Sequence, residues 1–212
     1  AAWRTSPCDR PAMRPGRGLP DGCGRRRSRR PCSSARPAPD GVWRSRGKER
    51  PSFAKEPRPG QESVWDYPRP PAILVDQRRV EVRLGDLVIA DSLQNYRILE
   101  TASPPTFYIP PHSVRIRLLE PCLGSSVCEW KGVAHYWTLK DHPSSSQSVG
   151  WSYPNPSPPF EAIAGYFSFY PARVECFVGG ERVRPQPGEF YGGWVTSEIV
   201  GPCKGEPGTG NW

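Results

Sequence analysis

The sequence predicts a mainly β protein, an antiparallel domain preceded by a disordered basic tail. From residue 63 onward, short runs of β-branched and aromatic residues are separated by Pro, Gly, Asp and Asn at intervals of roughly ten residues. The first 50 residues instead hold 14 of the 29 basic residues, against four of the 21 acidic ones, and show no apolar periodicity. We therefore expect residues 1–60 to be a disordered tail and residues 61–212 to form a single β-rich domain.

The tail is dense in Arg, Pro and Ser, most clearly in GRRRSRRPCSSARPAP at residues 24–39. Such a segment buries too little apolar surface to offset the entropy of ordering it. Three interpretations stay open: an organelle transit peptide, a basic arm in weak contact with nucleic acid or another polyanion, and an incorrect N-terminus. The rest of the chain carries 15 basic and 17 acidic residues. Its charge therefore gives no reason to expect nucleic-acid binding by the domain itself.

The clearest strands are predicted at residues 78–92, RRVEVRLGDLVIADS. Valine and leucine alternate with charged residues over 79–84, which is typical of a strand with one buried face. Gly85 and Asp86 then predict a turn, and residues 87–90 a returning strand. The segment is therefore expected to be a β-hairpin.

Further strands are expected downstream. Residues 91–100, DSLQNYRILE, fit either a short helix or a strand. Residues 105–110 and 114–120 are typical of another antiparallel pair. The period-2 pattern then continues in four later segments: 132–140, 149–154, 163–171 and 174–185, the last with a Gly179-Gly180 turn. Residues 191–212 are rich in Gly and Pro but retain Trp and Ile, so we expect an extended segment that wraps the sheet.

The stretch CEWKGVAHYW, residues 128–137, combines a thiol, a carboxylate, an amine and an imidazole. Its strand positions are largely apolar on both faces, so we expect a central strand covered on both sides, with His135 packed or hydrogen-bonded in it. Lys131 at the start of this strand, beside Cys128 and Trp130, could line a pocket and hold an anion. The alternative is an ordinary solvated lysine with its aliphatic stem on the indole.

A second aromatic block, WSYPNPSPPFEAIAGYFSFYP, spans residues 151–171. Trp151 and Tyr153 alternate on one side of a strand, which the following prolines end. These rings could cover the core or form the wall of a ligand pocket, because Trp and Tyr combine a flat apolar face with a polar group. The single carboxylate here, Glu161, is weak evidence for acid–base chemistry.

Familiar metal and catalytic motifs are missing from the sequence. The cysteines and histidines show no zinc-binding spacing, and no phosphate-binding glycine loop, nucleophile elbow or His-Glu-x-x-His occurs. We therefore expect no metal and no cofactor. No run reaches the ~18 apolar residues that span a bilayer, so we expect a soluble, cytoplasmic protein with no membrane partner, unless the tail directs it to an organelle. A Cys122–Cys128 disulfide is suggested only by proximity in the sequence.

Seven segments stand out together: VWDYPRPP, IADSLQNYRILET, PTFYIPPHSV, CEWKGVAHYW, WSYPNP, IAGYFSFYP and GGWVTSEIVGPCKGEPGTGNW. In this order they resemble the family known as domain of unknown function 427, over residues 64–212. The resemblance implies a small β-tent of two sheets, related to domains that bind small ligands or zinc, although the zinc cysteines of those relatives are absent here. Some catalogues label the family nucleotidyltransferase-like. That label lacks support here, because Gly124-Ser125-Ser126 is not followed by the acidic pair that would hold the metal.

The resemblance carries over no established catalytic residue. It does draw attention to eight residues that a β-tent could bring to one cleft: Arg97, Glu100, Tyr108, Cys128, Lys131, Tyr136, Trp151 and Tyr153. We predict a module that binds an unknown small polar or anionic molecule in an aromatic-walled cleft, with Arg97 and Lys131 offering positive charge. Two alternatives stay open. One is an enzyme of unknown reaction that uses Cys128 and Lys131, and the other is a structural or interaction module whose tail carries the contacts.

Overall fold

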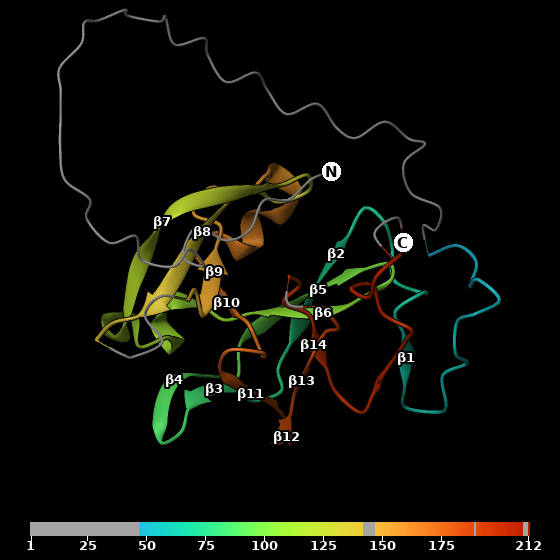
Figure 1. The fold of residues 1–212 in the computed structure, drawn as a ribbon, viewed down its shortest axis with the longest axis horizontal. Helices are drawn as coiled ribbons and strands as arrows, with labels where there is room; N and C mark the ends of the chain where they lie inside the picture. Colours follow the sequence, from blue (N-terminus) through green and yellow to red (C-terminus); the bar gives the residue numbers. More distant parts are fainter. Residues whose placement is uncertain (1–46, 142–146, 189, 210–211) are drawn as a thin grey trace, which may run out of the picture.

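The computed structural model describes residues 47–141, 147–188, 190–209 and 212. These residues form a mainly β domain with five small sheets, four of them antiparallel (Figure 1), which confirms the predicted fold class. Three short 3-10 segments complete the regular structure of the described residues: Pro111–Ser113, Ile116–Leu118 and Pro158–Ile163. None of the helical segments in these ranges is long and apolar enough to cross a membrane.

Two of the sheets have four strands each. The first, in the order β12-β11-β3-β4, consists of β3 (Val80–Leu84), β4 (Leu87–Ser92), β11 (Glu175–Val178) and β12 (Glu181–Arg182). The second, in the order β10-β9-β8-β7, consists of β7 (Leu119–Cys128), β8 (Gly132–Leu139), β9 (Gly150–Ser152) and β10 (Phe167–Phe169).

The remaining sheets are smaller. One has three strands in the order β2-β5-β6: β2 (Ala72–Asp76), β5 (Asn95–Glu100) and β6 (Ser103–Tyr108). The other two are strand pairs: β1 (Glu62–Ser63) with β15 (Ile199–Val200), and β13 (Arg184–Pro185) with β14 (Trp194–Val195).

Several predicted elements are confirmed. Strands β3 and β4 form the hairpin expected at residues 78–92, with Gly85 at a φ of 57° in the turn. Gly179 and Gly180 take φ values of 58° and 86° between β11 and β12, a backbone conformation that glycine adopts without strain. Residues 95–100 form strand β5, so the strand alternative holds for DSLQNYRILE.

The expected pairing of residues 105–110 with 114–120 is wrong. Strand β6 pairs with β5 instead, because a tight turn at Ala102, with φ of 69°, folds the chain directly back. The prolines at 110 and 111 then end the extended chain, and a 3-10 turn begins at Pro111. The alternating apolar residues after it fall largely in the second 3-10 turn, Ile116–Leu118.

The expectation for strand β8 needs a correction too. The strand is central, between β7 and β9, but its first half is not covered on both faces. Val133 is 43% exposed and His135 is exposed, so the packed histidine is wrong. Val133 and His135 share the face of β8 opposite Ala134, and this face is open to solvent. Strand β9 has three residues and pairs only with residues 135–137 of β8, so the hairpin of β7 and β8 extends beyond it (Figure 1).

The largest hydrophobic cluster packs the two four-stranded sheets together with the end of β6. Trp194 is fully buried there, and its ring centroid lies 5.0 Å from that of Phe107. Its indole Nε1 donates a hydrogen bond of 3.0 Å to the Phe169 carbonyl, which satisfies the polar group of a buried ring.

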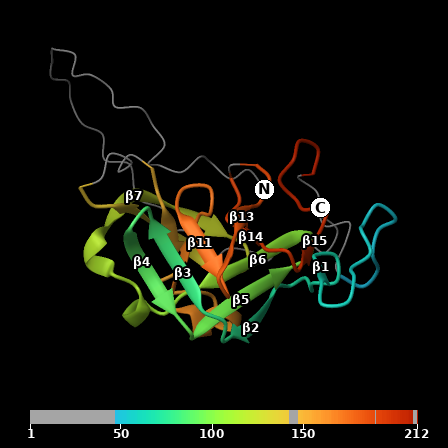
Figure 2. The same ribbon diagram turned by 90° about the horizontal axis from the view of Figure 1, so that it is seen from below.

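Both ends of the described chain contact the domain, and Figure 2 shows β15 beside β1. The C-terminal segment, which we expected to be extended, is only partly so: β14 and β15 have two residues each, and turns lie at residues 197–198 and 207–208. Strand β15 pairs in parallel with β1, and the Trp65 Nε1 donates 3.0 Å to the Pro202 carbonyl. At the N-terminal end of the described chain, contacts with the domain begin before residue 60, where we expected the tail to end. The centroid of the Phe53 ring lies 5.1 Å from that of Trp65 and 5.0 Å from that of Trp212. The disorder predicted for residues 1–46 lies outside the described residues.

Candidate functional site: an aromatic cavity with a buried lysine

A cavity of about 330 Å³ opens among β5, β6, β8, β9 and residues from the C-terminal segment. Eight aromatic residues line it: Tyr108, Trp130, Tyr136, Trp151, Tyr153, Tyr170, Phe190 and Tyr191. Its ionisable and amide groups are Glu100, Glu129, Lys131, Arg173, Gln186 and Lys204.

The cavity brings together seven of the eight candidate residues predicted from sequence: Glu100, Tyr108, Cys128, Lys131, Tyr136, Trp151 and Tyr153. Arg97 lies outside it. Successive side chains of a strand point to opposite faces, so β5 turns Ile98 and Glu100 toward the cavity and Arg97 away from it.

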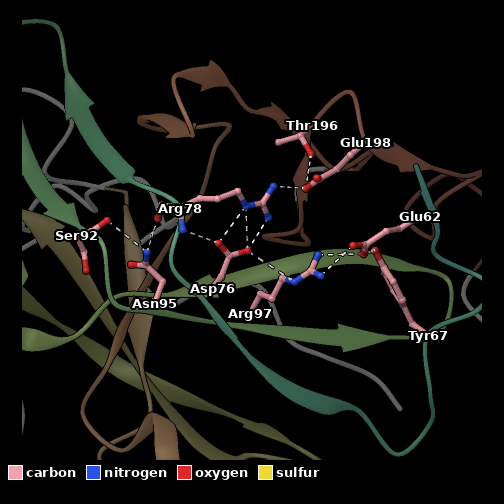
Figure 3. Close-up of polar contacts among 9 residues, drawn as sticks. All are labelled: Glu62, Tyr67, Asp76, Arg78, Ser92, Asn95, Arg97, Thr196 and Glu198. Atoms are coloured by element: carbon pink, nitrogen blue, oxygen red, sulfur yellow. Dashed lines mark hydrogen bonds and ion pairs between the residues drawn. The ribbon is translucent and has the colours of Figure 1, made fainter. Parts of the chain in front are cut away.

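Arg97 instead belongs to a network of charged side chains (Figure 3). Its Nη2 lies 2.9 Å from Glu62 Oε1, and its Nε lies 3.7 Å from Asp76 Oδ2. The pKa of Arg97 is raised: burial acts to lower it, and the Glu62 carboxylate raises it by more. Its charge is thus already matched within the protein.

The local sequence explains how the other side chains reach the cavity. Alternation along β8 places Ala134 and Tyr136 on the cavity face, opposite the exposed Val133. Gly132 has a φ of 92°, a value that favours glycine, and follows Lys131 at the bend into the strand. The Lys131 carbonyl accepts a hydrogen bond of 3.1 Å from the backbone N–H of Ser157, which fixes this bend.

Lys131 is the group that distinguishes the inner end of the cavity. The residue is only 8% exposed, and its Nζ lies 5.9 Å from the centre of the Tyr153 ring and 6.0 Å from that of Phe160. No described carboxylate lies within the 4.0 Å ion-pair distance of this nitrogen. A buried charge without a counter-charge is costly, so this arrangement requires an explanation.

The ammonium group of Lys131 is nevertheless charged at neutral pH. Burial acts to lower the pKa of Lys131, but the interactions with Cys128 and Tyr108 raise it by more, and the pKa lies above its usual value. The raised pKa favours the charged form of Lys131, which lies beside aromatic faces, and this arrangement favours cation–π contact and anion binding.

Tyr108 supplies a hydroxyl group in the same region. Its side chain is fully buried, and its oxygen accepts a hydrogen bond of 3.2 Å from Trp151 Nε1. Burial raises the pKa of Tyr108, so the hydroxyl keeps its proton at neutral pH. Because the oxygen already accepts from the indole, its own O–H is available as a donor. The Trp130 Nε1, also on a lining residue, is buried and has no acceptor among the described residues.

The other charged residues in or beside the lining carry both positive and negative charges. Arg69 Nη2 lies 3.3 Å from Glu100 Oε1. Burial and the neighbouring Glu100 raise the pKa of Glu129, while burial lowers the pKa of Lys204. Arg173 donates to Ser148 Oγ at 2.6 Å. Both signs of charge therefore occur in this part of the lining.

The thiol of Cys128 lines the cavity as a free, buried cysteine. The suggested Cys122–Cys128 disulfide is therefore not formed. Cys128 and Lys131 stand at the two sides of the short turn between β7 and β8, which explains why they reach one cavity.

Sequence reasoning missed several lining residues. Glu129 and Trp130 lie within the quoted stretch between Cys128 and Lys131, and that adjacency was a usable signal. Gln186 and Lys204 come from the last 30 residues, joined by a hydrogen bond of 2.6 Å from Gln186 Nε2 to the Lys204 carbonyl. No local pattern marks either of them.

The fold and the site together define a mainly β domain with an aromatic cavity assembled from several sheets. The chain belongs to the family described as domain of unknown function (DUF427), whose profile matches residues 72–180, and the predicted membership is thereby confirmed. The match includes strands β2 to β11 and all seven candidate residues in the cavity, and it ends before Gln186 and Lys204. No curated protein matches the chain.

Proposed function

We propose that this protein is a binding module whose aromatic cavity holds one small polar or anionic molecule. The observation that carries the proposal is the convergence of eight aromatic residues and buried Lys131 on one cavity of about 330 Å³. This volume is at the lower end of the roughly 300–1,000 Å³ typical of small-molecule sites. Flat apolar walls with a few polar groups at fixed positions are the usual composition of such sites.

A cavity-filling substitution tests the proposal. Ala134 lies on the cavity face of β8 and is buried, so Ala134→Phe would place a ring in the cavity. Val133→Phe is the matched control, because residue 133 lies on the same strand but faces away and is 43% exposed. Three probes of equal size and different charge are added to each protein: benzoate, benzamide and benzylamine. Binding is measured by saturation-transfer NMR and by quenching of tryptophan fluorescence.

We expect at least one probe to bind the wild type and Val133→Phe with similar affinity, and to lose at least about tenfold in affinity for Ala134→Phe, which corresponds to ~1.4 kcal/mol. Thermal unfolding shows whether both variants are folded. If no probe binds the wild type, or if folded Ala134→Phe binds as well as the control, the proposal is overturned.

A second candidate function is an enzyme in which Cys128 is the nucleophile. The observation in its favour is that the free Cys128 thiol and the Lys131 ammonium line the same cavity, and a neighbouring cation can stabilise a thiolate. Alkylation by iodoacetamide at neutral pH tests it. If Cys128 reacts no faster than free cysteine, it lacks the activation that a nucleophile of this class requires.

A further inference from the structure

We infer that the inner end of the cavity is an anion subsite, in which Lys131 and Tyr108 hold the carboxylate of a small organic acid beside the Cys128 thiol. This inference rests on the proposed function and names the ligand class for the same cavity. The ligand is a monocarboxylate with a flat apolar remainder.

The first argument is the charge of Lys131. Two buried or half-buried arginines elsewhere in the described chain face carboxylates: Arg69 lies 3.3 Å from Glu100, and Arg97 lies 2.9 Å from Glu62. No carboxylate of the described residues lies within 4.0 Å of the Lys131 ammonium group, although Lys131 is only 8% exposed and lines a cavity. A ligand carboxylate at this end would supply the missing counter-charge, and the cost of burying the ammonium group is already borne by the folded protein.

The second argument is the set of hydrogen-bond donors on lining residues of the cavity. The Tyr108 hydroxyl accepts from Trp151 and so can donate its own proton. The Trp130 Nε1 is buried and has no acceptor in the part of the chain that the structure describes. Buried donors that lack acceptors are rare in proteins, and a carboxylate is an acceptor with two oxygens. Charge and donors thus point to the same ligand group.

The third argument concerns the rest of the ligand. The rings of Trp151 and Tyr170 lie 4.6 Å apart between centroids, and the Tyr153 ring lies 6.3 Å from Tyr108, so flat apolar faces line the cavity next to the charge. Glu100 and Glu129 also line the cavity and would repel a second anionic group. The site therefore favours one carboxylate on a flat apolar body.

Cys128 provides a direct test, because two alkylating reagents of similar size differ only in charge. Iodoacetate carries a carboxylate, and iodoacetamide is neutral. With each reagent the Cys128 sulfur forms a bond to the methylene carbon, the carbon–iodine bond breaks, iodide leaves, and the thiol proton passes to the buffer. The rate at Cys128 is followed by mass spectrometry of the full chain after digestion, and free cysteine is measured under the same conditions.

The quantity compared is the ratio of the iodoacetate rate to the iodoacetamide rate. A cleft lined by one sign of charge raises the local concentration of an oppositely charged ion by about 10- to 1,000-fold, and the lower end of this range applies here because Glu100 and Glu129 also line the cavity. We therefore expect this ratio to be at least about tenfold higher at Cys128 than at free cysteine. In Lys131→Met, which keeps the length of the side chain and removes its charge, the ratio should fall to that of free cysteine.

Lys140→Met is the matched control. It removes the same charge from an exposed lysine just after the same strand, so it should leave the ratio unchanged. Any change in the intrinsic reactivity of the thiol affects both reagents and cancels in the ratio.

A ratio at Cys128 equal to that of free cysteine, or one that Lys131→Met does not change, overturns the inference. If Cys128 reacts with neither reagent, benzoate and benzamide binding decides: benzoate should bind at least about tenfold more tightly to the wild type and lose that preference in Lys131→Met. Equal affinities would overturn the inference. If benzoate and benzamide bind equally well but neither binds Ala134→Phe, the proposed function still stands while the inference fails. The failure of the inference can therefore be distinguished from the failure of the proposed function.

Discussion

Trp151 contacts two other aromatic rings of the cavity wall, those of Tyr108 and Tyr170, and a glycine on another segment leaves room for it. Its Nε1 donates to Tyr108, and its ring lies 4.6 Å from that of Tyr170. A Cβ atom at Gly192 would lie 2.2 Å from Cη2 of the indole, far inside van der Waals contact. The position of the indole therefore depends on the absence of a side chain at residue 192.

Gly192→Ala is expected to displace the Trp151 ring into the cavity. The free energy of unfolding should fall by about 1–3 kcal/mol, as overpacking of a well-filled site usually costs. Benzoate and benzamide should both bind more weakly, because a wall of the cavity has moved rather than its charge. Denaturant unfolding, probe titrations and the tryptophan emission spectrum measure these effects. Gly193→Ala is the comparison, since its Cβ would meet Gln186 and not Trp151; equal emission changes in both variants would contradict this account.

The candidate residues could be predicted where family motifs and strand periodicity agreed. Trp151 and Tyr153 were assigned to one face of one strand, and both line the cavity. Arg97 and Glu100 were chosen together, yet residues three apart on a strand lie on opposite faces, and only Glu100 lines the cavity. The alternation of faces along the strand would have predicted that Arg97 and Glu100 do not share one cavity. It would not have predicted which of the two lines the cavity, because both faces of β5 are partly buried.

At the scale of elements, the charged network in Figure 3 joins segments that are far apart in the sequence. Asp76 ends β2, and its Oδ2 lies 2.6 Å from Arg78 Nη2. The Nη1 of Arg78 lies 2.7 Å from Glu198 Oε1, directly before β15. Arg97 of β5 pairs with Glu62 of β1. The network therefore ties the three-stranded sheet to the β1–β15 pair.

The network should make stability depend on pH. Burial acts to raise the pKa of Asp76, but hydrogen bonds from Arg78 lower it by more, so the folded pKa lies below the usual 3.8. A depressed folded pKa means that the contribution to stability is complete above about pH 4 and is lost as the pH falls through the folded pKa. Asp76→Asn should cost about 2 kcal/mol at pH 7, less than the 3–5 kcal/mol for a fully buried pair, because Arg78 is partly exposed. The difference from the wild type should shrink below about pH 4.

Urea unfolding at pH 7, 5, 4 and 3 measures this dependence. Asp86→Asn makes the same chemical change at an exposed turn and should leave the free energy of unfolding within about 0.5 kcal/mol of the wild type at each pH. A constant difference between Asp76→Asn and the wild type from pH 7 to pH 3 would show that the carboxylate charge is not the stabilising feature.

Most strands could be predicted from the sequence, but their partners could be predicted less well. The hairpin of β3 and β4 follows from local alternation and one glycine turn. Strand β6 pairs with β5, and β11 pairs with β3, but the sequence patterns of these segments do not indicate which strand each will pair with. Strands as short as β9 and β10 exist because neighbouring strands complete their hydrogen bonds, which is a property of the assembled sheet rather than of three residues.

At the scale of the whole molecule, the cavity is assembled from residues as distant as Ile98 and Lys204. The backbone N–H of Lys204 donates 2.7 Å to the Ala102 carbonyl, and its own carbonyl accepts from Gln186. The C-terminal segment is thus part of the wall as well as a cover for the sheet. Contacts of this range could not be predicted from local periodicity, which carries information only about neighbouring residues.

Removing residues 203–212 should therefore weaken both stability and ligand binding. The truncation removes the backbone bonds of Lys204 to Ala102 and Gln186, and it leaves the buried Gln186 amide without that acceptor. We expect the free energy of unfolding to fall by about 3 kcal/mol, and the affinity for the benzoate probe to fall because one wall is missing. Trp212→Ala separates the two effects: it removes a ring stacked 5.0 Å from Phe53 but keeps Lys204, so it should lower stability by about 1–2 kcal/mol and leave benzoate affinity unchanged. If the truncated protein bound benzoate as tightly as the full chain, the C-terminal segment would cover the domain without contributing to the site.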